Sequence, residues 1–86
     1  MKTIFRLTKQ QNAVIYCLQN GWNLITYCEM PGAIVASDEY EFSIGGRLFW
    51  NLVNKGLISQ SGEEHHFNYR LTPLGERIKT VPVKMF

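Results

Sequence analysis

The sequence predicts a single α+β domain with the element order α-β-β-α-β-β-α. Three segments combine helix-capping residues with helical periodicity, and four short runs of strand formers are bounded by turn residues. No repeat, low-complexity tract or linker divides the 86 residues, of which 45% are hydrophobic. A chain of this length is enough for one small core. We therefore expect one domain over residues 1–86, with an apolar tail at 81–86.

The first predicted helix runs from Lys9 to about Asn20 and follows a capping box. In a capping box, the Thr8 hydroxyl accepts from the backbone of Gln11, and the Gln11 side chain reaches back to the backbone of Thr8. Gly21 is suited to end the helix. Helical spacing predicts a buried side made by Val14, Cys17 and Leu18, with part of Ala13 or Tyr16.

Residues 22–37 are predicted to form a β-hairpin. Strand formers dominate residues 22–28 and 34–36, and Pro31-Gly32 between them has the central residues of a type II turn. An acidic connection at 37–42 follows the hairpin. Its residues fit either a strand extension or a single helical turn.

A helix predicted at 43–55 has one apolar and one polar side. Ser43 is its predicted N-cap, and Gly56 fits the left-handed position just past its end. At about 100° per residue, the apolar stripe consists of Ile44, Leu48 and Leu52, widened by Phe49 and Val53. The opposite side carries Gly46, Arg47, Asn51 and Asn54, with Trp50 at the border.

A second hairpin and a third helix complete the predicted fold. Strands at 57–60 and 65–71 flank a turn at 61–64. Alternation along the second strand predicts one buried and one solvated face. Thr72 caps the last helix, predicted from Pro73 to about Lys79, with proline at the first position, where its missing N–H is not needed.

Charge is unevenly distributed along the chain, although the net charge is only +2. The two ends and the helix at 43–55 are basic, whereas residues 10–42 and the turn containing Glu63 and Glu64 are acidic. Basic segments that converge in space would form one face suited to a polyanion. The modest net charge permits nucleic-acid binding without arguing for it.

The two cysteines match no disulfide or metal-binding pattern. Cys17 and Cys28 have no partner motif, so we expect buried free thiols rather than a disulfide or a metal pair. The N-terminus lacks the apolar run of a signal peptide, and no stretch approaches the roughly 20 apolar residues of a membrane span. These features predict a cytoplasmic protein without membrane contact, metal or cofactor.

Catalytic chemistry has little support in the sequence. His65 and His66 are adjacent on a predicted strand, so they point to opposite faces and do not converge on one ligand. No Ser/His/Asp arrangement, phosphate-binding glycine loop or paired carboxylate site is evident. We therefore expect a protein that is not an enzyme.

Two local patterns resemble the winged-helix family of DNA-binding domains. Residues 52–58, Leu-Val-Asn-Lys-Gly-Leu-Ile, are similar to the end of a recognition helix that runs into a wing strand. Residues 69–75, Tyr-Arg-Leu-Thr-Pro-Leu-Gly, resemble the second wing strand entering the C-terminal helix of many bacterial winged-helix regulators. With the wing between them, the resemblance covers residues 43–79. The family normally has a separate second helix where this chain has a predicted hairpin and an acidic segment.

The resemblance implies a small winged-helix DNA-binding protein, a transcriptional regulator by type, that reads double-stranded DNA with the helix at 43–55. In such a docking Arg47 would pair with guanine, and Asn51 or Asn54 would address adenine. Gly46 would let the helix N-terminus approach a phosphate. The candidate phosphate contacts are Lys9, Arg70, Arg77 and Lys79.

The alternative is a winged-helix protein–protein interaction module, or a homodimer, that does not bind DNA. Trp50 and the tail at 81–86 supply apolar surface beyond the needs of a small core, and such surface often marks an interface. The candidate interface residues are Trp50, Val83, Met85 and Phe86. The polar residues of the helix at 43–55 also fit an ordinary solvated face. An open face flanked by basic groups would favour DNA binding, and a covered face would not.

Overall fold

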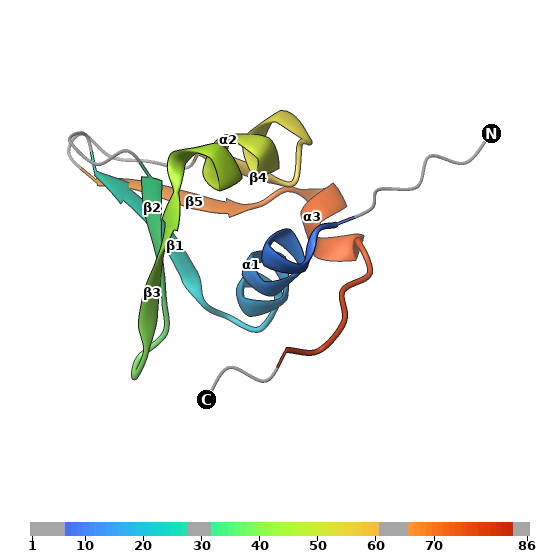
Figure 1. Cartoon of the computed structure of the whole chain (residues 1–86), viewed down its shortest axis with the longest axis horizontal. Helices are drawn as coiled ribbons and strands as arrows, with labels where there is room; N and C mark the ends of the chain where they lie inside the picture. The colour runs from blue at the N-terminus through green and yellow to red at the C-terminus, as the bar shows by residue number, and fades with distance from the viewer. Residues whose placement is uncertain (1–6, 28–31, 61–65, 84–86) are drawn as a thin grey trace.

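The computed structural model describes residues 7–27, 32–60 and 66–83 of the chain. Its elements are α1 (Lys9–Gln19), β1 (Asn23–Tyr27), β2 (Gly32–Ala36), β3 (Glu41–Gly45), α2 (Gly46–Asn54), β4 (Ile58–Gln60), β5 (His66–Leu71) and α3 (Pro73–Arg77). Over these described ranges, the five strands form one antiparallel sheet in the order β3-β2-β1-β5-β4. The three helices lie to one side of the sheet (Figure 1). The prediction of an α+β domain is confirmed.

Helix α1 begins and ends as its sequence predicts. The Thr8 N–H donates to Gln11 Oε1 at 3.1 Å, and the Gln11 N–H donates to Thr8 Oγ1 at 3.1 Å, which completes the capping box. At the other end Gly21 has a φ of 94°, and the amides of Gly21 and Trp22 donate to carbonyls of the last helical turn. The same arrangement ends α2 at Gly56, where φ is 74°. Each glycine therefore turns a helix directly into a strand.

The core lies between α1, α2 and the sheet. The predicted Val14, Cys17 and Leu18 are all buried. The other buried apolar residues are Ile15, Leu24, Ala33, Val35, Ile44, Phe49, Leu52, Leu57 and Ile58. Cys17 is a free thiol, as expected, and burial raises its pKa. Cys28 lies outside the described residues.

The hairpin predicted at 22–37 is confirmed, but the predicted element order lacks one strand. Strands β1 and β2 pair antiparallel with Leu24 opposite Val35, and the predicted turn extends into residues that the structure does not describe. Strand β3 then pairs with β2 over five residue pairs, from Ala36 opposite Glu41 to Gly32 opposite Gly45. The observed order is therefore α-β-β-β-α-β-β-α.

The start of the helix predicted at 43–55 is wrong. Ser43 is not an N-cap but lies in β3, opposite Ile34 of β2. Helix α2 starts only at Gly46, and its N-cap, Gly45, makes no side-chain hydrogen bond. Pairing with β2 satisfies the backbone of this segment and buries Ile44 to 8% exposure, which outweighs the local capping preference of serine. The predicted end at Gly56 is confirmed.

Thr72 joins the end of α2 to the start of α3. Its N–H donates to the Leu57 carbonyl at 3.0 Å, and its hydroxyl donates to the Gly56 carbonyl at 2.5 Å. The same hydroxyl accepts from the Gly75 N–H at 3.1 Å, which makes Thr72 the predicted N-cap of α3. Gly75 is buried, and a Cβ at that position would collide with the Leu57 carbonyl oxygen. We call Gly56, Leu57, Thr72 and Gly75 the Thr72 junction.

Substitution Gly75→Ala is expected to lower the free energy of unfolding by about 1–3 kcal/mol, because the added methyl group must displace backbone rather than a flexible side chain. Urea unfolding followed by circular dichroism measures this difference. The control is Lys79→Ala, an exposed position beyond α3, which should stay within about 0.5 kcal/mol of the wild type. Equal stabilities for the two variants would show that the junction is not tightly packed.

Candidate functional site

Helix α2 presents four exposed side chains on the side facing away from the core. They are Arg47, Trp50, Asn51 and Asn54, which we call the α2 front. Their spacing of three, four and seven residues places them along one stripe of a helix. On the opposite side Phe49 is 4% exposed and Leu52 is 0% exposed. The front is thus open to a ligand while the back of the same helix is part of the core.

Trp50 is the exposed aromatic residue at the predicted border of the α2 front, on the side of Phe49. Its side chain is 56% exposed. The indole packs edge-to-face on the Phe49 ring at 5.2 Å between centroids, and Phe49 packs edge-to-face on Tyr69 of β5 at 4.8 Å. These two contacts hold an exposed aromatic ring in a defined orientation.

A groove of about 500 Å³ runs between α2, the end of β3 and the start of α1. Its polar lining comes from Thr8, Gln10, Gln11, Ser43, Arg47 and Asn51. Its apolar lining comes from Ala13, Val14, Phe42, Ile44 and Leu48. Sequence patterns did not identify Gln10 or Ser43 as lining residues, because their proximity to Arg47 depends on how α1 packs beside β3. The first residue of α2, Gly46, is half-buried next to this groove.

Lys55 fixes the end of α2 to the start of α1. Its Nζ donates to Gln11 Oε1 at 3.0 Å, and the same oxygen accepts the Thr8 N–H. Gln11 is only 3% exposed, and its charge-assisted contact with Lys55 is partly buried. The sequence assigns Gln11 only to the capping box and Lys55 only to the helix terminus. The structure shows that the two residues also link the start of α1 to the end of α2.

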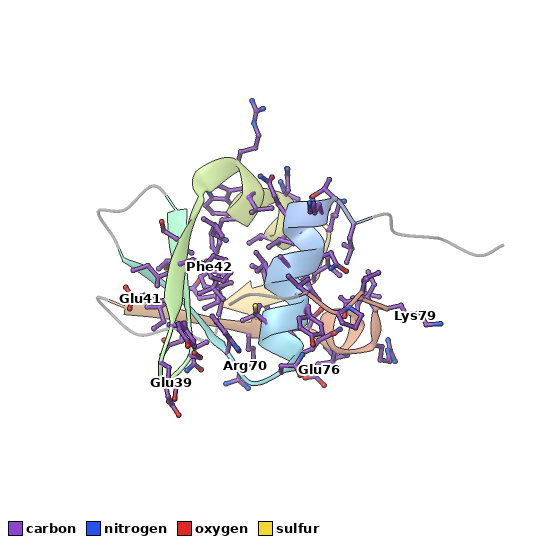
Figure 2. The ribbon with its side chains drawn as sticks, turned by 60° about the horizontal axis from the view of Figure 1, so that its bottom comes forward. Glu39, Glu41, Phe42, Arg70, Glu76 and Lys79 are labelled. Carbon is purple, nitrogen blue, oxygen red and sulfur yellow. The ribbon has the colours of Figure 1, made fainter. Side chains whose placement is uncertain are left out.

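The helices beside the groove carry no acidic residue. The sequences of α1, α2 and β4 contain none, whereas they and the C-cap of α2 supply Lys9, Arg47 and Lys55. The acidic connection predicted before the helix forms the turn between β2 and β3 and the start of β3. Glu39 lies at the end of this hairpin remote from α2 (Figure 2), and Glu41 is the first residue of β3. Glu41 and Gly45 are four residues apart along β3, which corresponds to about 13 Å. This distance exceeds the screening length of about 8 Å at physiological salt, so the charge of Glu41 is largely screened at the start of α2. The predicted Glu63 and Glu64 lie outside the described residues.

The structure does not gather all the predicted phosphate contacts around α2. Arg70 is exposed on β5, and strand alternation places it on the face opposite Tyr69, which packs against α2. It shares a hollow with Glu76 at the end of the molecule opposite α2 (Figure 2). Lys79 projects at the side of the molecule in the same view. Arg77 is exposed in the last turn of α3.

Lys9 lies nearer to the α2 groove than Arg70 does. It is exposed in the first turn of α1 and directly precedes Gln10, which lines the groove. Lys9 also lines a separate hollow of about 690 Å³ between α1 and the C-terminal segment, in which Val83 takes part. A cation at this position stands between the α2 groove and the C-terminal segment.

The C-terminal segment, predicted as a partner interface, is fixed to α1 by side-chain amides. Asn12 Nδ2 donates to the Val81 carbonyl at 2.9 Å, and the Val81 N–H donates to Asn12 Oδ1 at 2.8 Å. About two turns further along α1, Gln19 Nε2 donates to the carbonyls of Gly75 and Ile78, at 3.0 and 2.8 Å. The Val81 side chain remains 69% exposed and Val83 is half-buried. Met85 and Phe86 lie outside the described residues.

Substitution Asn12→Ala is expected to release the backbone at Val81, because one side chain supplies both of the hydrogen bonds found there. Amide hydrogen exchange at Val81 should accelerate, while the free energy of unfolding falls by only about 1 kcal/mol, as is usual for exposed hydrogen bonds. Gln10→Ala, at the exposed position two residues earlier, should leave this exchange rate unchanged. Equal exchange rates in wild type and Asn12→Ala would contradict the assignment.

Within residues 7–27, 32–60 and 66–83, no group of three His, Cys, Asp or Glu side chains is placed to hold a metal ion. No helix in that part of the chain is long and apolar enough to cross a membrane. Comparison of the chain with known protein families, curated proteins and solved structures finds no match.

Proposed function

We propose that the protein is a small winged-helix DNA-binding protein, a transcriptional regulator by type, that places α2 in the major groove of double-stranded DNA. The α2 front is the observation that carries this proposal, since Arg47, Asn51 and Asn54 are exposed on a helix whose back is buried. Helix α2 has nine residues and is about 13.5 Å long, and the usual helix diameter of about 10–12 Å fits the major groove, which is about 12 Å wide.

The three polar side chains of the front match the hydrogen-bonding groups of bases. The Arg47 guanidinium pairs with O6 and N7 of guanine, and a carboxamide from Asn51 or Asn54 pairs with N6 and N7 of adenine. Arg47 and Asn54 are seven residues apart, about 10 Å along the helix axis, which corresponds to about three base-pair steps. One short helix can therefore address consecutive base pairs.

The charge distribution favours a polyanion at this surface. Acidic residues are missing from α1, α2 and β4, and the described acidic residues stand at the hairpin tip and on α3. Lys9 flanks the groove and is the phosphate contact that fits this docking best. Arg70 faces away from α2 and makes no contact in it.

The arrangement of the elements supports the winged-helix part of the proposal. The two local patterns of the resemblance lie where α2 leads into β4 and where β5 leads into α3, and α1 and β1 precede them in the chain. Strands β2 and β3 occupy the place in the chain where the family normally has its second helix. The helix that crosses the DNA backbone in that family is thus replaced by a hairpin in this chain.

Substitution Arg47→Ala is expected to reduce the preference for a duplex selected from a random pool over a scrambled duplex by about 10-fold or more, because a bidentate guanine contact is lost. Fluorescence anisotropy at several salt concentrations measures both affinities. Wild-type affinity should fall steeply with salt, since phosphate contacts release counterions.

Arg70→Ala is the matched control for Arg47→Ala. It removes the same charge from the opposite end of the molecule and should preserve sequence preference and nearly all of the affinity. Equal losses from the two variants would show that α2 is not the reading surface. Binding that is undetectable or insensitive to salt would remove the DNA proposal altogether.

A second candidate function is association with a protein partner or a second copy of the chain. The observation that favours it is the exposure of two large apolar side chains, Trp50 at 56% and Val81 at 69%. Sedimentation of the full chain against a chain ending at Thr80 tests the contribution of the tail. A dimer that dissociates on truncation would support this function, and a monomer in both cases would exclude a tail-mediated dimer.

A further inference from the structure

Trp50 is an apolar residue at the β5-side edge of a polar surface. It lies on the α2 front between Arg47 and Asn54, with Asn51 beside it. Its ring is 56% exposed, yet it is held edge-to-face by Phe49, which is itself held by Tyr69. The ring therefore keeps its orientation without being part of the core. Such a side chain needs an apolar partner that leaves the surrounding polar groups hydrogen-bonded.

We propose that Trp50 contacts the C5-methyl group of a thymine in the major groove, so that α2 selects an A·T pair one or two steps from the guanine read by Arg47. This inference rests on the proposed DNA binding, and it specifies which group of the DNA the Trp50 ring contacts. The thymine methyl is the apolar group that a base pair displays in the major groove, and apolar side chains recognise it there.

The neighbours of Trp50 favour DNA over a protein partner. A protein pocket deep enough for the indole would also cover Arg47 and Asn54, each within about one helical turn. Burying these donors without partners is costly, and an apolar pocket supplies none. The major groove places base acceptors beside the methyl group, and the helices bordering this surface contain no acid that would repel phosphate.

Helix geometry indicates where the thymine lies. Trp50 follows Arg47 by three residues and precedes Asn54 by four, so it is offset along the axis by about 4.5 Å and 6 Å, or one to two base steps. Asn51 lines the groove beside α1, whereas the contact with Phe49 directs Trp50 toward the β5 side of α2. The thymine is therefore expected one or two steps from the guanine, on the β5 side of the docked helix.

Replacement of thymine by deoxyuridine tests this contact directly, since uracil lacks the methyl group but keeps every hydrogen-bonding group. A duplex is first selected from a random pool with the wild-type protein, and each thymine is then replaced singly. One replacement should weaken wild-type binding about fourfold, the effect of one buried methylene-sized group. Trp50→Ala should bind the thymine and uracil duplexes equally.

Tyr40→Ala is the control, because Tyr40 is also an exposed aromatic, at 45%, but lies in the turn between β2 and β3. It should keep the full thymine preference, and circular dichroism verifies that both variants fold. Selective duplex binding that no uracil replacement changes would overturn the Trp50 inference and leave the DNA proposal standing. A thymine preference that persists in Trp50→Ala would do the same. Failure to bind any duplex would overturn both the Trp50 inference and the DNA proposal. A dimer that depends on Trp50, found instead of duplex binding, would have the same consequence.

Discussion

The direction of α2 depends on the hydrogen bonds of Thr72. One residue accepts from α3 and donates twice to the turn that follows α2, so two segments that are fifteen or more residues apart become one rigid joint. Gly75 completes the joint because its missing side chain leaves room for the Leu57 carbonyl. At its other end, α2 begins directly after Gly45, the last residue of β3. A helix held at both ends presents one face to solvent and keeps it there, which is a requirement for recognition by a short helix.

Side-chain amides of α1 hold the rest of the framework together. Gln11 accepts from Thr8 and Lys55, Asn12 pairs with the backbone of Val81, and Gln19 reaches two carbonyls near α3. Carboxamides suit this task because each carries a donor and an acceptor and needs no counterion. The polar side of α1, which a sequence pattern assigns to solvent, thereby organises the C-terminal segment and leaves the surface beside α2 free of acidic charge. Stability and the electrostatics of the proposed DNA surface thus rest on the same residues.

Local signals in the sequence predict most of the fold, and the exceptions are all long-range. The capping box at Thr8, the N-cap at Thr72 and the glycine helix ends are predicted correctly because the interacting groups lie within a few residues of one another. Local sequence patterns place Ser43 at a helix start. They miss its pairing with Ile34 of β2, because strand register and core burial decide that pairing and no window around Ser43 contains them. Periodicity alone predicts that Arg47, Asn51 and Asn54 are exposed. It cannot predict the groove beside them, the fixation of Val81 by Asn12 or the remote position of Arg70, because each depends on how separate elements pack.

The two tryptophans of the chain stand in contrasting surroundings. Trp22 is half-buried with its ring 5.9 Å from that of Phe42, whereas Trp50 is exposed on the helix that the chain presents to solvent. Indole emission shifts with the polarity around the ring, so the two fluorophores report on different events. Trp22 senses whether the layers of the domain remain together, and Trp50 senses whether anything covers α2. The molecule therefore contains its own optical probes for folding and for occupancy, and removing either indole leaves the other signal isolated.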